Sequence, residues 1–158
     1  MKVLTTAALL ALISTAPASA AGCAAPASAK AAIPELARLI NTYRSRNGAA
    51  PLKIAPPLVA AAQGHACDMV ATGRFSHDGK GGAKARMKRA GCRTRKTGET
   101  IAMGYSSPKR TLQQWIESPP HRQILLMRNM TVMGIGLAEP APGQGGGPRW
   151  VLDVSAGC

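Results

Sequence analysis

Aromatic and acidic residues are both scarce in this chain of 158 residues. Phe, Trp and Tyr make up 3% of the sequence, so a core has to be filled mainly by Ala, Leu, Ile, Val and Met. Only 7 Asp and Glu stand against 20 Lys and Arg, which gives a formal net charge of +13. Such an excess favours anionic partners but says nothing about the fold.

Several motifs of catalysis and metal binding are missing. The chain contains neither Gly-x-Ser-x-Gly nor His-Glu-x-x-His, and no two cysteines have the Cys-x-x-Cys spacing. It also has no internal repeat. No residue set demands chemistry, so we expect a binding protein more than an enzyme.

The one long apolar run, from Val3 to Ile13, is too short to span a bilayer. It follows Lys2 and precedes the small residues 18–20, a pattern typical of a secretory signal over residues 1–20. Residues 21–33 are predicted to be an extended lead, and residues 34–158 a single domain. We therefore expect a secreted or periplasmic monomer with no transmembrane segment after signal removal.

Four cysteines, Cys23, Cys67, Cys92 and Cys158, follow the predicted signal. An even count in an exported chain indicates two disulfides, for which three pairings are possible. We favour Cys23 with Cys67 and Cys92 with Cys158, because each bridge would tie one terminus to the domain. The alternative is lipidation of Cys23, although Ala20 stands where a lipoprotein signal would have leucine.

The hydrophobic pattern predicts helices that start at Pro34, at Pro56 and after Ser107. Shorter helices are expected at residues 83–90 and from His121, and strands at 97–102, 131–138 and 150–154. A glycine-rich loop is expected at 78–82. This order indicates an α+β domain, with a small sheet covered by helices on both faces. Trp150, Trp115 and Phe75 are expected in its core.

Basic residues are concentrated between positions 80 and 96. This segment has no aromatic residue for base stacking, which argues against nucleic acid. Anionic lipids or acidic envelope polymers are better partners, unless the segment is simply a solvated face. The residues that would bind them are Lys80, Lys84, Arg86, Lys88, Arg89, Arg93, Arg95 and Lys96.

Three polar residues, His77, Glu99 and His121, form the candidate site. Each adjoins apolar residues that could anchor it at the rim of a core. Two imidazoles and a carboxylate could hold a divalent cation such as zinc and leave one position open. They could equally form a hydrogen-bonded cluster that needs no ligand. His65 shares a helical stripe with core residues and is expected to be a hydrogen-bonded core histidine.

Four segments in one register resemble bacterial members of the CAP superfamily, the SCP-like extracellular domains. The resemblance covers about residues 34–155. The segments are Ala62-x-x-His65-Ala66-x-Asp68-Met69-x-Ala71-x-Gly73-x-Phe75-Ser76-His77, Gly98-Glu99-x-Ile101-Ala102, Trp115-x-x-Ser118-Pro119-x-His121-Arg122-x-x-Leu125 and Gly134-Ile135-Gly136.

The resemblance implies a three-layer α-β-α sandwich with a small, mostly antiparallel sheet. It also implies a cleft with His77 and His121 on opposite walls and Glu99 between them. Lipids, sterols and anionic polymers are the ligands that the family suggests, and a metal-dependent hydrolase or peptidase using the same cleft is the alternative. Where plant and animal members carry a second glutamate, this chain has Ser118, and Glu117 is expected to point elsewhere.

Overall fold

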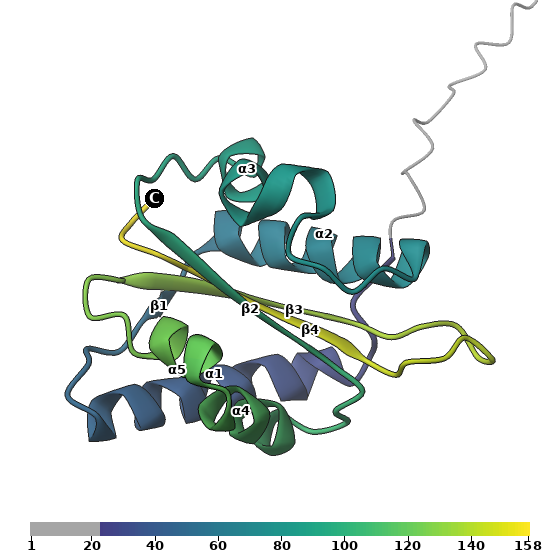
Figure 1. Ribbon diagram of the computed structural model, residues 1–158, viewed down its shortest axis with the longest axis horizontal. Coiled ribbons are helices and arrows are strands. Elements are labelled where there is room, and N and C mark those ends of the chain that lie inside the picture. Colours follow the sequence, from purple (N-terminus) through teal and green to yellow (C-terminus); the bar gives the residue numbers. More distant parts are fainter. Residues whose placement is uncertain (1–22) are drawn as a thin grey trace, which may run out of the picture.

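A four-stranded sheet forms the middle layer of the computed structural model, which describes residues 23–158 (Figure 1). Its strands are β1 (Lys53–Ile54), β2 (Thr97–Met103), β3 (Val132–Ala138) and β4 (Arg149–Ser155), in the spatial order β1-β3-β4-β2. β4 pairs antiparallel with both β2 and β3, and β1 runs parallel to β3. The predicted mostly antiparallel sheet is confirmed. The predicted signal, residues 1–20, lies outside the described residues.

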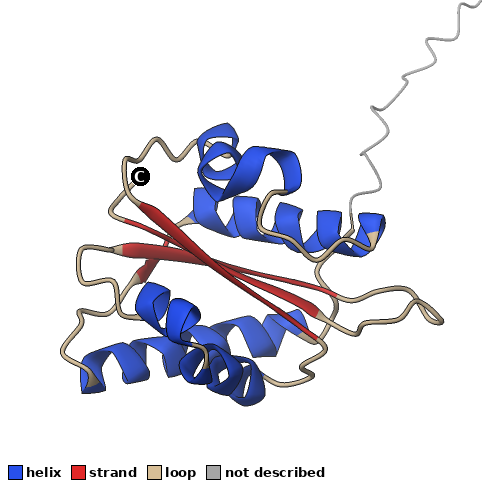
Figure 2. Cartoon of the chain, in the orientation of Figure 1, coloured by secondary structure: helices blue, strands red, loops and turns tan. Residues whose placement is uncertain are grey.

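Helices cover both faces of the sheet (Figures 1 and 2). α1 (Ala29–Arg46), α4 (Pro108–Glu117) and α5 (Pro119–Leu125) lie on one face, and α2 (Pro56–Thr72) and α3 (Gly82–Arg89) on the other. The 3-10 helix η1 (Gly79–Gly81) occupies the predicted loop at 78–82. The three-layer α-β-α sandwich is therefore confirmed.

The first helix begins earlier than the sequence suggested. We predicted an extended lead to residue 33 and a start at Pro34, whereas α1 begins at Ala29 and contains Pro34. Alanine has the highest helix propensity, and Ala29 also packs into the core, where it is 4% exposed. Pro34 is exposed in the second turn, so the helix accepts the loss of one hydrogen bond there.

α2 rests directly on β3 because two glycines remove the side chains between them. A β-carbon at Gly134 would collide with the backbone of Leu58, and one at Gly136 with the backbone of Ala62. Gly134 and Gly136 of β3 thus face the part of α2 that contains Leu58 and Ala62.

The two tryptophans anchor the core, as predicted. Trp115 and Trp150 are almost fully buried, and their ring N–H groups donate to the carbonyls of Ile101 (3.1 Å) and Tyr105 (2.8 Å). The prediction for Phe75 was wrong, because this residue is 42% exposed. Gly73 adopts a left-handed conformation (φ +68°) that ends α2 and leads the chain to the surface before Phe75.

Both disulfides have the favoured pairing. Cys23 bonds Cys67 and Cys92 bonds Cys158, with α-carbon separations of 5.4 and 4.6 Å. The thiol of Cys23 is thus engaged, which argues against its lipidation. Within residues 23–158, none of the helices has the length and apolar character needed to cross a membrane.

Candidate functional site

His77 and His121 line one cleft, although 44 residues separate them in the sequence. The cleft has a volume of about 300 Å³. His77 comes from the loop after α2, and His121 from the first turn of α5. The remaining walls are formed by Phe75, Ser76, Ile101, Ala102, Met103, Tyr105 and Gln114.

Glu99 lies beneath His77 and fixes its orientation. Its side chain is 3% exposed, and its Oε1 accepts a hydrogen bond from His77 Nδ1 at 2.8 Å. Its Oε2 pairs with the guanidinium of Arg86. Within residues 23–158, neither a hydrogen bond nor an ion pair joins His121 to this group. The structure therefore connects two of the three predicted residues and places the third across the cleft.

One residue of the predicted anion-binding segment, Arg86, is not on the surface. It is only 5% exposed, because its guanidinium donates to Glu99 and to the carbonyl oxygens of His77 (3.0 Å) and Gly79. Arg86 is buried because the Glu99 carboxylate and two carbonyl oxygens lie within hydrogen-bonding distance of its guanidinium. Arg86 therefore belongs to the support of the cleft and is not available to a surface partner.

The charges of this group follow from its contacts. The hydrogen bond to Glu99 raises the pKa of His77 despite partial burial. Burial alone would raise the pKa of Glu99, but the hydrogen bond from His77 and the charge of Arg86 lower it. Burial, and then the charge of His77, lowers the pKa of His121. The cleft thus presents one imidazole whose protonated form is favoured, His77, and one whose neutral form is favoured, His121.

Two polar atoms in the cleft are buried without a hydrogen-bond partner among the described residues: His121 Nδ1 and Gln114 Oε1. Such atoms are uncommon in folded proteins, and they mark places where a ligand or water can bind. The sequence did not single out Gln114, because a glutamine on an amphipathic helix carries no distinctive pattern. Glu117 points elsewhere, as expected, and accepts a hydrogen bond from Gln113 at 2.6 Å.

The residues do not form a ready metal site. Among residues 23–158, no three His, Cys, Asp or Glu side chains are grouped so that they could hold an ion. Both oxygens of Glu99 already have partners, and a metal ligand must be an unprotonated imidazole, which the raised pKa of His77 opposes. A zinc ion would have to replace these contacts.

Two more titratable residues lie behind Glu99. Asp153 is opposite Glu99 in the β2–β4 pairing, and burial together with the neighbouring Glu99 raises its pKa well above the usual range. His65 Nε2 is 3.9 Å from Glu99 Oε1. His65 is fully buried, as predicted, but its ring nitrogens lack the expected hydrogen bonds to other described residues.

Comparisons with known proteins agree with this architecture. Residues 37–153 match the family model described as CAP, the Cysteine-rich secretory protein family. This match spans more than half of the chain, which therefore belongs to the CAP family. An uncharacterized protein of Bacillus subtilis (strain 168), YkwD, is 32% identical over 117 residues, which are 73% of this chain and 46% of YkwD.

Solved structures give the same result for the fold. An extracellular SCP-domain protein of Bacillus anthracis has a TM-score of 0.70 at 27% identity, over 77% of this chain and 39% of that protein. An outer surface protein of Borrelia burgdorferi has a TM-score of 0.75 at 18% identity, over 82% and 96% respectively. The chain spans less than half of YkwD and of the B. anthracis protein.

Proposed function

We propose that this protein is a secreted binding protein whose cleft holds a ligand with an acidic group next to an apolar part. The observation that carries this proposal is the cleft wall itself. His77, whose protonation is favoured by Glu99, lines the same cleft as His121 and Gln114, whose Nδ1 and Oε1 have no hydrogen-bond partner in the described part of the chain. The two imidazoles can donate hydrogen bonds to a carboxylate or phosphate and orient it, whereas Gln114 Oε1 only accepts and would pair with a hydroxyl group or a water molecule.

The rim of the cleft supports the apolar part of the ligand. Phe75 and Met103 are 42% and 40% exposed, and both line the cleft beside Tyr105. Large exposed apolar side chains at the edge of a polar hollow are typical of a binding surface. An acidic amphiphile, such as a fatty acid, meets both requirements. A secreted location agrees with the similarity to the extracellular protein of B. anthracis.

Calorimetric titration with octanoate tests this proposal. We expect saturable binding to the oxidised protein, at least tenfold weaker binding of uncharged octan-1-ol, and about tenfold loss in a His121→Ala variant, since one charge-assisted contact is worth about that factor. Glu117→Gln is the matched control, because Glu117 lies on the neighbouring helix outside the cleft. Equal binding of octanoate by wild type and His121→Ala would overturn the proposal.

Zinc binding by His77, Glu99 and His121 stays a separate prediction, as does a metal-dependent hydrolase in the same cleft. Titration with zinc chloride, beside a His77→Ala/His121→Ala double variant, tests the first. Binding that the double variant abolishes would show that the cleft rearranges to hold the ion and would justify assays of hydrolysis. The contacts described above favour an organic acid over the metal.

The basic segment is a second candidate surface. Lys84, Lys88, Arg93 and Arg95 line a groove of about 380 Å³ with Cys92 and Thr94, and all four cations are exposed. Anionic lipid or an acidic envelope polymer fits such a groove. We expect co-sedimentation with phosphatidylglycerol vesicles that weakens steeply between about 50 and 500 mM salt, as screening requires. A Lys84→Gln/Lys88→Gln variant should lose it, and Arg86 should not contribute.

A further inference from the structure

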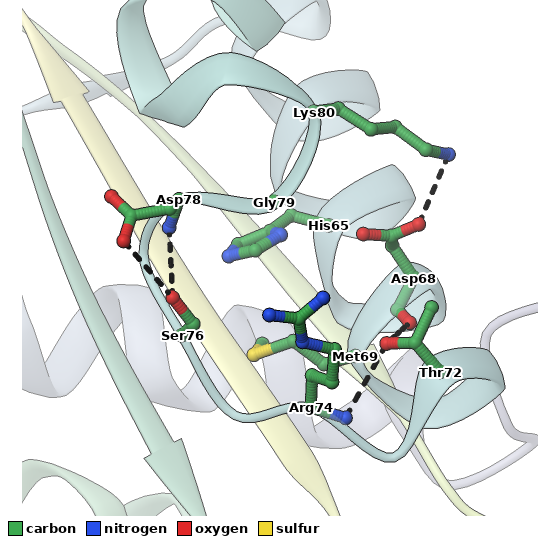
Figure 3. Close-up of a pocket in the computed structure, with 9 residues that line it drawn as sticks. All are labelled: His65, Asp68, Met69, Thr72, Arg74, Ser76, Asp78, Gly79 and Lys80. Atoms are coloured by element: carbon green, nitrogen blue, oxygen red, sulfur yellow. Dashed lines mark hydrogen bonds and ion pairs between the residues drawn. The ribbon is translucent and has the colours of Figure 1, made fainter.

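A second cavity adjoins the loop that carries His77. Its volume is about 360 Å³, within the range of small-molecule sites. α2 forms its floor through His65, Asp68, Met69 and Thr72, and the segment from Arg74 to Lys80 forms its wall (Figure 3). Of the residues that line the cleft, only Ser76 also lines this cavity.

His65 is the most buried polar residue in the lining of this cavity. Its side chain is 0% exposed, and neither ring nitrogen has a hydrogen-bond partner among the described residues. A buried imidazole without a partner is costly unless something in the cavity completes its hydrogen bonds. Burial also lowers the pKa of His65, so the ring is neutral and can donate one hydrogen bond and accept another.

The side chain of Asp68, one turn further along α2, lines the same cavity. Its Oδ1 is 3.3 Å from Lys80 Nζ, in a pair whose lysine side chain is 63% exposed. A β-carbon at Gly79 would lie 2.9 Å from Asp68 Oδ2 and 3.0 Å from His65 Cε1. The second carboxylate oxygen and the imidazole therefore approach one point under the Gly79 backbone. A solvated lysine is a weak competitor for this carboxylate.

Arg74 provides the opposite charge. Figure 3 shows its guanidinium turned toward His65 across the cavity, and it forms no ion pair within residues 23–158. A guanidinium matches the two oxygens of a carboxylate. The lining also includes Asp78, so it carries two acidic and two basic side chains and no net charge. A cavity with positive and negative side chains at different places suits a ligand that carries both a negative and a positive charge.

We propose that this cavity is a second ligand site, and that it binds a small zwitterion such as a free α-amino acid. Arg74 pairs with the carboxylate of the ligand, and Asp68 with its ammonium group. His65 contributes a hydrogen bond from the floor. This site is independent of the acid-binding cleft, so either assignment can fail without the other.

Amide-resolved NMR titration of the oxidised protein with glycine and L-alanine tests the proposal. We expect saturating shifts at residues 65–80 with a Kd of about 1 mM or tighter, which is reasonable for so few ligand atoms. Acetate and methylammonium, each with one of the two charges, should bind at least tenfold more weakly. Arg74→Gln should weaken amino-acid binding about tenfold.

Two variants serve as controls. Arg38→Gln removes another exposed arginine, from α1 on the other face of the sheet, and should leave the titration unchanged. His121→Ala removes a cleft residue and should also leave it unchanged. Acetate binding as tightly as glycine, no saturation by about 20 mM of either amino acid, or an unchanged Kd in Arg74→Gln would each overturn the proposal.

Discussion

The Arg86 side chain supports the cleft from beneath. It pairs with Glu99 and holds the loop through the carbonyl oxygens of His77 and Gly79. Replacing it with Gln leaves a buried carboxylate whose one remaining hydrogen-bond partner among the described residues is His77. Breaking a buried ion pair in this way costs about 3 kcal/mol or more, so we expect a loss of that size in the free energy of unfolding, measured with urea.

The neighbouring cation gives the matched control. Lys88 is exposed on the same helix, and Lys88→Gln should change stability by less than about 0.5 kcal/mol. Arg86→Lys keeps the charge but loses the fork geometry, so its loss should be intermediate. If Arg86→Gln is no less stable than Lys88→Gln, Arg86 does not support the cleft in solution.

The His77–Glu99 hydrogen bond also gives a pH dependence with a definite sign. Because the folded pKa of His77 is raised, its contribution is complete below the ordinary histidine pKa of about 6.5 and is lost as the pH rises through the folded value. The stability difference between wild type and His77→Gln should therefore be larger at about pH 5.5 than at about pH 9. Urea unfolding at both values measures it.

A histidine titration by NMR provides an independent check on the same contact. The His77 ring should titrate with a pKa above the ordinary value, while the pKa of the His121 ring should lie below it. A His77 midpoint at or below that of an unfolded-chain histidine would contradict the contact, whatever the urea experiments show.

At the scale of single residues, the sequence pointed to residues whose side-chain chemistry is distinctive. It missed residues whose role depends on the side chains that the fold brings next to them. His77 and His121 line one cleft, and both could be singled out because histidine and its motif context are visible in the sequence. Arg86 looks like its exposed neighbours until Glu99 is brought beneath it from another element. Gln114 becomes notable only because its Oε1 is buried without a partner in the described part of the chain.

α2 and β3 pack backbone against backbone at Gly134 and Gly136. A methyl group at position 136 would overlap the backbone of Ala62, which no side-chain rotamer can relieve. We expect Gly136→Ala to cost about 3 kcal/mol of unfolding free energy, since overpacking against a rigid backbone moves the whole helix. Thermal and urea unfolding measure this loss.

α2 itself supplies the control for this experiment. Gly64 lies on the exposed side of the helix, and a β-carbon there would have no neighbour within 4 Å. Gly64→Ala should stabilise the protein by up to about 1 kcal/mol, because alanine is a better helix former than glycine. The same substitution, Gly to Ala, should thus lower the free energy of unfolding at position 136 and raise it at position 64. The same sign in both would show that α2 does not pack on β3 as described.

The elements themselves were largely predictable. Helices with Pro at their first position and strands longer than five residues have strong local signals, and α2, α4, β3 and β4 lie where the pattern placed them. β1 has only two residues and exists because its backbone pairs with β3. The early start of α1 depends on Ala29 packing into the core. Both require tertiary contacts that local sequence does not encode.

At the scale of the whole molecule, the disulfides join parts that the core alone would hold less firmly. Cys23 precedes α1 and bonds to Cys67 on α2, so this bridge ties the segment that leads into one helical layer to a helix of the other layer. Cys92 follows α3 and bonds to Cys158 after β4. Their surroundings differ: Cys92 is 1% exposed within a core cluster, whereas Cys23 is exposed.

This difference predicts unequal losses when each bridge is removed. The bridges span 44 and 66 residues, and chain entropy gives about 4 kcal/mol for either. Cys92→Ala/Cys158→Ala also leaves a small cavity in the core, so it should lose about 1 kcal/mol more than Cys23→Ala/Cys67→Ala. Guanidinium unfolding of the two double variants in oxidising buffer measures these losses. The wild type under reducing conditions is the reference for the loss of both bridges. If the Cys23–Cys67 variant is the less stable of the two, the connection between the helical layers outweighs the packing of Cys92, and the order argued here is wrong.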